Sequence, residues 1–149
     1  MTDRNDGMGT PEDSGGAPVD FDRLEVIAER LSTDERFDEI RVQPSFAPDR
    51  VVGVYDSSFY PRSVHTARLE IVWFENGDCS LQYHETHDEG TFDHRWDRHP
   101  SDHNARDHVH PGPDAPTPGT DSSHPPDWRD ILSMVLAEIE DRQRAFWVE

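Results

Sequence analysis

An alternating run of apolar residues is the strongest constraint on how this 149-residue chain folds. Apolar side chains occupy every second position on both sides of the sequence Glu75-Asn76-Gly77-Asp78. A two-residue period is typical of a β-strand with one buried face. Asn-Gly favours a type I′ turn, because both central residues of that turn need a positive φ. We therefore expect a β-hairpin whose buried face carries Ala67, Leu69, Ile71, Trp73, Cys79, Leu81 and Tyr83.

Shorter patterns predict the elements around this hairpin. Strands are expected at 40–46, where Ile40, Val42 and Phe46 alternate with polar residues, at 51–55, and at 92–97. Helical spacing of apolar residues begins after Asp20, with Asp20 or Asp22 as the cap, and again from about Asp127. The pattern predicts an α+β fold, in which an antiparallel β-sheet meander is flanked by an N-terminal and a C-terminal helix on one face.

The remaining segments set the expected domain organisation. Residues 1–19 are rich in Gly, Pro and acidic residues and predict a disordered acidic tail. Residues 20–149 predict a single α+β domain. Within that domain, the prolines of about 99–126 predict a long loop rich in His and Pro without regular structure.

The charge of the chain is strongly acidic. The formal net charge is −18, and all 14 basic residues are arginines. Acidity spread along a chain without lysine is the pattern of a protein that works in multimolar salt, so we expect a halophilic protein from a salt-loving archaeon. Because the Debye length falls to about 3 Å at 1 M salt, the net charge does not exclude an anionic partner there. No apolar run approaches the ~20 residues that span a bilayer, so we expect a cytoplasmic protein without a membrane partner.

Histidines gather in one window of the sequence. Five of the nine histidines lie between Thr91 and His110, together with three arginines. Imidazole titrates near neutral pH, so the window is a candidate for acid/base catalysis on RNA, with an arginine stabilising the phosphorane charge. The candidate catalytic residues are Arg95, Asp97, His99, His103, His108 and His110.

Two other interpretations of this window stay open. His108 and His110 lie on one side of an extended segment near other histidines and carboxylates, as a metal site needs. The single cysteine, Cys79, offers no cysteine-type zinc site. Alternatively, composition alone places histidines in a surface loop. Polar residues on neighbouring strands also mark a candidate open groove, carried by Arg68, Glu70, Gln82, His84 and Arg95.

The sequence from Phe92 to Pro100, with Arg95-Trp96-Asp97 at its centre, resembles the TumE family of toxin–antitoxin proteins. His103 and then His108-Val109-His110 follow it, as the histidine cluster does in that family. The resemblance covers roughly residues 37 to 146. It implies a small cytosolic toxin that acts on RNA as an endoribonuclease and is neutralised by a cognate antitoxin that binds DNA.

The expected function is therefore an RNA-cleaving or RNA-binding toxin that needs no cofactor and no metal. The first alternative is a non-enzymatic halophilic domain that binds a protein partner, for which the aromatic pair Phe146-Trp147 at the end of the last helix is a candidate contact. The second is a protein that binds a metal through His and Asp side chains.

Overall fold

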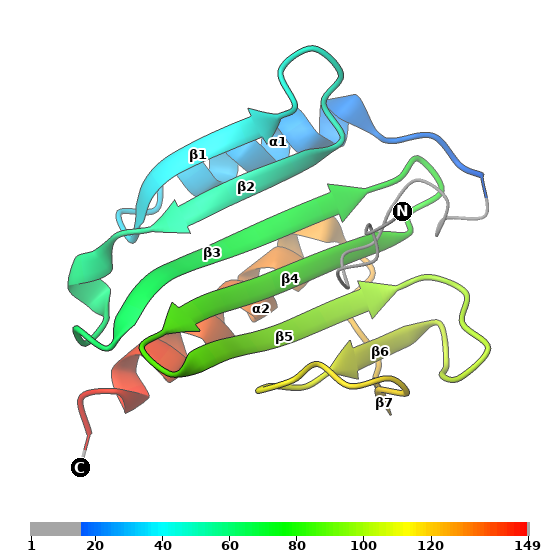
Figure 1. Ribbon diagram of the computed structural model, residues 1–149. Helices are drawn as coiled ribbons and strands as arrows, with labels where there is room; N and C mark the ends of the chain where they lie inside the picture. The colour runs from blue at the N-terminus through cyan, green and yellow to red at the C-terminus, as the bar shows by residue number, and fades with distance from the viewer. Residues whose placement is uncertain (1–15, 149) are drawn as a thin grey trace.

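The computed structural model describes residues 16–148. Within them, seven antiparallel strands form one sheet in chain order, and two long helices cover one of its faces (Figure 1). The predicted α+β meander with both helices on one side is confirmed. Its elements are α1 (Phe21–Ser32), β1 (Phe37–Gln43), β2 (Arg50–Tyr55), η3 (Ser57–Phe59), β3 (Val64–Trp73), β4 (Cys79–His87), β5 (Gly90–Arg98), β6 (Asp107–His110), β7 (Thr120–Asp121) and α2 (Trp128–Ala145).

The central hairpin joins β3 to β4 as the alternation predicts, but its turn is not type I′. Gly77 has a φ of +89°, whereas Ala115 is the one non-glycine residue of the described chain with a positive φ. The Gly77 N–H donates to the Phe74 carbonyl at 2.9 Å, which closes a three-residue loop with its glycine in the left-handed region. Asn76 is not among the residues with a positive φ, and its Oδ1 accepts from the Asp78 N–H at 3.0 Å.

Alternate side chains of the sheet pack against the two helices to form the core. Asp20 caps α1 by accepting from the Arg23 N–H at 3.0 Å, and Asp127 caps α2 by accepting from the Arg129 N–H at 2.8 Å. The other face of the sheet carries no helix of the described chain (Figure 1). Residues buried in the core include Leu24, Ile27, Leu31, Leu69, Ile71, Leu81, Tyr83, Trp96, Ile131, Leu132, Val135 and Ile139.

The end of β1 differs from the prediction. Phe46 was expected to continue the strand, but it lies beyond the strand's last residue, Gln43, and is 88% exposed. Pro44 follows Gln43 and has no N–H to donate to the strand ladder. The chain turns there instead, and the Asp49 N–H donates to the Gln43 carbonyl at 3.1 Å.

The segment 99–126 contains regular structure that the sequence did not indicate. β6 pairs with β5, and β7 pairs with β6, so the prediction of a loop throughout is wrong for these residues. Strands of four and two residues are too short to show a two-residue period. Of the expected tail, residues 1–15 lie outside the described residues, whereas Val19 pairs with Phe74 beside β3.

The single cysteine lies inside the sheet. Cys79 is 1% exposed, at the start of β4, opposite Trp73 of β3 and Arg98 of β5. Burial raises the pKa of its thiol to about 12. The thiol is therefore protonated near neutral pH and shielded by both neighbouring strands.

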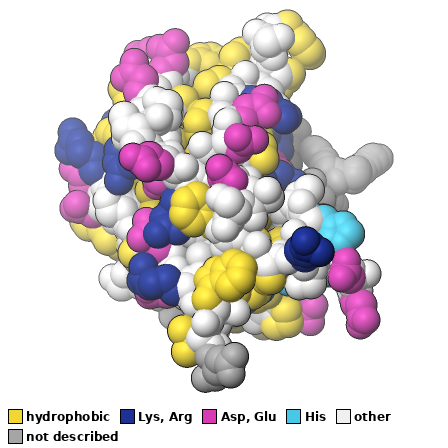
Figure 2. Space-filling view, turned by 90° about the vertical axis from the view of Figure 1, so that its left-hand side faces the viewer, with side chains coloured by type: hydrophobic (Ala, Val, Ile, Leu, Met, Phe, Trp, Pro, Cys, Tyr) yellow, Lys and Arg dark blue, Asp and Glu magenta, His cyan; other side chains and the backbone are white. Residues whose placement is uncertain are grey.

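Charges of both signs share the surface. In Figure 2, arginines lie among acidic side chains on the end of the molecule where the β4–β5 turn and the C-terminal end of α2 lie. None of the helices in residues 16–148 has the length and apolar character needed to cross a membrane.

Candidate functional site: a histidine cluster around Asp97

Strand pairing brings the candidate residues to the open face of the sheet. On β5, Trp96 packs into the core, so its neighbours Arg95 and Asp97 point to the opposite face. β6 places His108 opposite Asp97 and His110 opposite Arg95. Residues directly opposite each other in an antiparallel pair share one face of the sheet, so these four side chains meet there.

One carboxylate oxygen is the centre of the arrangement. Asp97 Oδ2 lies 3.2 Å from His99 Nε2, 3.5 Å from His108 Nε2 and 3.3 Å from His110 Nε2. It also accepts from Arg95 Nε at 2.9 Å. We call these five residues the Asp97 cluster. Asp97 and His108 are each 1% exposed, while the side chains of Arg95 and His99 are 14% and 19% exposed.

The opposite nitrogen of each imidazole contacts a backbone carbonyl. The Nδ1 atoms of His99, His108 and His110 lie 2.8 Å from the carbonyl oxygens of Pro100, Ala105 and Pro116, respectively. A carbonyl oxygen only accepts hydrogen bonds, so each Nδ1 carries a proton and donates it. In the neutral ring, Nε2 then holds a lone pair. The three lone pairs point toward the Asp97 carboxylate, which is itself an acceptor.

The charges of the cluster favour an ionised Asp97. Burial acts to raise its pKa, but the contacts with His108, His110 and His99 and the positive charge of Arg95 hold that pKa well below its usual value. For His99, burial acts to lower the pKa. The hydrogen bonds to Asp97 and to the Pro100 carbonyl outweigh it, so the net pKa is raised.

Five of the six predicted site residues therefore lie together. His103 does not join them within residues 16–148: it is exposed in the segment between β5 and β6, where its backbone N–H donates to Ser101 Oγ at 3.1 Å. Nothing in the sequence indicated that His103 differs from the other histidines of the window. The chain leaves the sheet between residues 99 and 106, and His103 lies in that segment.

Two residues that support the cluster were missed by the sequence analysis. Ser80 Oγ donates to Asp97 Oδ1 at 2.7 Å from the neighbouring strand. His124 Nε2 lies 3.1 Å from the Asp97 carbonyl and 3.2 Å from the His108 carbonyl, so it ties β5 to β6 through their backbones. A polar residue at position 80, between apolar Cys79 and Leu81, was a usable signal for the first. Nothing local marks the second.

A polar groove adjoins the cluster on the same face. Its volume is about 350 Å³. Arg95 belongs to both, so the groove leads to the side of Asp97 on which the guanidinium lies. The groove predicted from the sequence is thus present, and its lining residues are Arg68, Glu70, Gln82, His84, Asp93, Arg95, Asp114 and Ala115.

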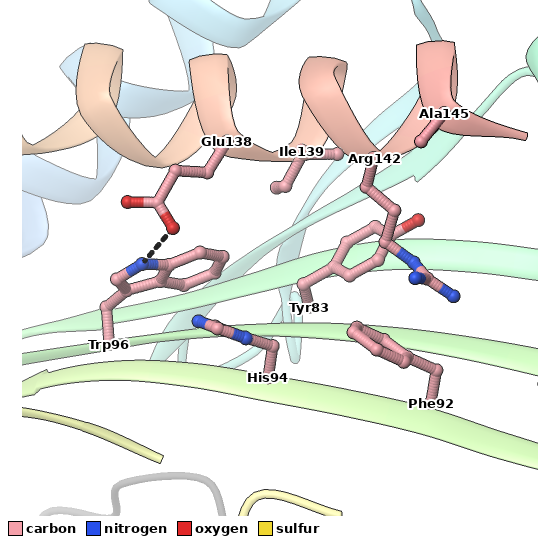
Figure 3. A pocket seen from close by; sticks show the side chains of 8 residues that line it. All are labelled: Tyr83, Phe92, His94, Trp96, Glu138, Ile139, Arg142 and Ala145. Carbon is pink, nitrogen blue, oxygen red and sulfur yellow. Dashed lines mark hydrogen bonds between the residues drawn. The ribbon is translucent and has the colours of Figure 1, made fainter. Parts of the chain in front are cut away.

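A second pocket, of about 240 Å³, lies on the opposite side of the sheet under α2 (Figure 3). His94 projects into it between Phe92 and Trp96, and Arg142 reaches in from the helix (Figure 3). Burial and the nearby Arg142 lower the pKa of His94 to about 4. This histidine of the same sequence window therefore faces away from the Asp97 cluster and is neutral at neutral pH.

The cluster also has the donor set of a metal site. One carboxylate oxygen and one nitrogen from each of two imidazoles, those of Asp97, His99 and His108, all lie within 4.8 Å of one another. Imidazole and carboxylate are usual ligands of divalent transition metals. The arrangement therefore suits two chemistries, proton transfer between imidazoles and a bound substrate, or coordination of a cation.

Comparison with known proteins identifies the family. The family model described as "Toxin TumE" matches residues 23–143. Searches of curated proteins and of solved structures gave no match. The matched span runs from within α1 to within α2 and includes the whole Asp97 cluster. The chain therefore belongs to the TumE toxin family.

Proposed function

We propose that this toxin acts on RNA in the cytoplasm by cleaving it at the Asp97 cluster, and that a cognate antitoxin neutralises it. The observation that carries the proposal is the convergence of Arg95 and three imidazoles on one buried carboxylate beside an open groove. Guanidinium groups bind phosphate oxygens well, and imidazoles exchange protons near neutral pH. Cleavage of a phosphodiester needs both properties.

The exposure of the side chains assigns their roles. Arg95 and His99 are the partly exposed members of the cluster, and Arg95 also lines the polar groove, so a phosphate bound at this edge would contact Arg95 from the groove and reach His99 as the other accessible side chain. His108 and His110 are almost fully buried and hold Asp97 from β6. In this proposal Arg95 and His99 are catalytic residues, and Asp97, His108 and His110 are positioning residues.

RNA binding to so acidic a chain requires short-range contacts. With a net charge of −18, long-range attraction of an anion is absent. In multimolar salt the repulsion between the acidic chain and the RNA phosphates is screened within about 3 Å. Counterion release then contributes little to the affinity. Affinity would then come from hydrogen bonds and base stacking. The groove offers polar side chains for such contacts in Gln82, His84 and Arg95. RNA would have to compete there with Asp93, which already contacts Gln82 and His84.

The test is incubation of purified protein with total RNA in multimolar KCl. We expect cleavage by the native chain, loss of at least about 100-fold in rate for Arg95→Gln, and a similar loss for the double variant His108→Ala/His110→Ala. His103→Ala is the matched control, since this exposed histidine lies outside the cluster, and it should cleave as the native chain does.

Expression in a salt-adapted host tests the toxin role separately. The native chain should arrest growth, and coexpression of the neighbouring antitoxin gene should restore it. Folded native protein that leaves all RNA intact would refute RNA cleavage. The exposed Trp147, at 59%, would then favour a non-enzymatic domain that contacts a protein partner.

A further inference from the structure

We infer that Asp97, His99 and His108 form a binding site for one divalent transition-metal ion such as Zn²⁺. The inference concerns the resting protein, in which His99 Nε2 would hold the ion and would not be free to exchange a proton with RNA. It departs from the metal-free site that the sequence favoured and selects specific ligands for the metal alternative that the sequence left open.

The first observation is the orientation of the rings. Each imidazole donates its Nδ1 proton to a backbone carbonyl, so Nε2 faces Asp97 and, in the neutral ring, carries a lone pair. Metal-bound histidines usually show this arrangement, because the outer hydrogen bond fixes the tautomer and the ring.

The second observation is an unsatisfied atom. His108 Nε2 is buried and has no hydrogen-bond partner among the described residues. It lies 3.5 Å from Asp97 Oδ2, too far for a good hydrogen bond. A buried polar atom without a hydrogen-bond partner lowers the stability of the folded state by about 1–3 kcal/mol. Because this atom lies among other side chains that can bind metal, a bound metal ion would be a suitable partner for it.

The third observation is the spacing. Four ligands at about 2.0–2.2 Å from a zinc ion, at the corners of a tetrahedron, lie about 3.3–3.6 Å apart. The distances from Asp97 Oδ2 to His99 Nε2 and His108 Nε2 are 3.2 and 3.5 Å. The rings of His99 and His108 are also nearly perpendicular, at 86°, so both nitrogens can approach one point.

Added protons would satisfy the three Nε2 atoms and the Asp97 carboxylate less well than one divalent metal ion would. One added proton bonds one Nε2 and leaves the other lone pairs facing each other, and protonating all three rings would place three positive charges beside Arg95 in a buried site. One divalent ion accepts several lone pairs at once. Asp97 Oδ1 is already bound by Ser80, and Oδ2 retains a lone pair beyond its bond with Arg95.

The site would leave a coordination position open. Three protein ligands and a free position are typical of catalytic zinc sites, whereas structural sites are closed by four. His110 Nε2, 3.3 Å from Asp97 Oδ2, is not one of the three ligands that lie within 4.8 Å of one another. Because imidazole nitrogens dominate the set, Mg²⁺, which prefers oxygen ligands, should bind poorly.

The experiment is a metal titration of the full chain after chelator treatment, in multimolar KCl, followed by calorimetry and metal analysis. We expect one Zn²⁺ per chain, no competition by millimolar Mg²⁺, and, with Co²⁺, the visible absorption bands of a four- or five-coordinate ion. His99→Ala and Asp97→Asn should each lower the affinity more than about 100-fold, beyond the 10–100-fold typical of outer contacts. His103→Ala should bind as the native chain does.

Circular dichroism of each variant verifies that it is folded, and His99 is the safest ligand to remove because its side chain is partly exposed. No stoichiometric Zn²⁺, or equal binding by native chain and folded His99→Ala, would overturn the inference. Stoichiometric Zn²⁺ with intact RNA would support the metal site and refute cleavage. RNA cleavage by a chain that binds no Zn²⁺ would refute the metal site and support the nuclease.

Discussion

Glu85 shows how a single residue governs stability in this fold. Its side chain is 0% exposed and contacts Tyr83, His87 and both Nε and Nη2 of Arg142, the last two at 2.7 Å. Burial acts to raise the pKa of Glu85, but the bonds from Arg142, Tyr83 and His87 lower it below 4.5. The buried carboxylate is therefore ionised, and its charge depends on Arg142.

Replacement of Arg142 by Met should lower the free energy of unfolding by about 3 kcal/mol, because it leaves a buried charge unpaired. The Met side chain preserves apolar packing on Phe92, over which the guanidinium lies at 3.5 Å. Chemical denaturation in KCl measures the loss. Arg144→Met on the same helix, at a site 62% exposed, is the control and should change stability by less than about 0.5 kcal/mol.

The pH dependence has a definite sign. Because the folded pKa of Glu85 is depressed, its contribution is present above about pH 4.5 and is lost as the pH falls through the folded value. The difference in stability between the native chain and Glu85→Gln should therefore shrink in acid. A difference that grows below pH 4.5 would contradict an ionised Glu85.

At the scale of elements, the β3–β4 turn allows the contribution of one backbone conformation to stability to be measured without a change in packing. A Cβ at Gly77 would meet nothing within 4 Å, so substitution changes only the conformational cost of a φ of +89°. Gly77→Ala should lower the free energy of unfolding by about 1 kcal/mol, since alanine disfavours the left-handed region. Gly77→Asn, which tolerates that region better, should cost less. Thermal unfolding of both variants gives the comparison, and equal stability of native chain and Gly77→Ala would refute the argument.

The same elements show what the sequence could predict. The hairpin residues Leu69 and Tyr83 and the helix caps Asp20 and Asp127 carry local signals, so the central hairpin and both helices were placed correctly. The turn type was wrong because the strand register pairs Trp73 with Cys79, and the Phe74 N–H donates to the Asp78 carbonyl, which leaves three residues in the loop and not two. β6 and β7 were missed because long-range partners define such short strands.

The same limit applies to the site. All five residues of the Asp97 cluster were candidates from composition and resemblance. The register of β5 and β6 decides which histidines contact Asp97. Ser80 and His124 join only through contacts 17 and 27 residues away along the chain. Ser80 carries a weak local signal, as a polar residue between two apolar ones, whereas the role of His124 follows only from contacts between distant segments.

The whole molecule carries 32 acidic and 14 basic residues. Their mutual repulsion acts against the folded state at low ionic strength, and salt screens it. The midpoint of thermal unfolding should therefore rise when KCl is increased from about 0.1 M to 2 M, where the Debye length falls from about 10 Å to below 3 Å. Glycerol, which does not screen charge, is the control. A midpoint that stays constant or falls with KCl would contradict a chain adapted to salt.

The buried thiol of Cys79 can be used to measure how often the core of the sheet opens. Cys79 is the single cysteine of the chain, and its thiol packs in the hydrophobic core at the end of the sheet next to the β3–β4 turn. A thiol reagent can reach it only when the core around it opens, so the labelling rate reports opening of the core at this end of the sheet. Comparison of the labelling rates with and without Zn²⁺ would show whether binding at the Asp97 cluster, on β5 and β6, stabilises the sheet as far as β4.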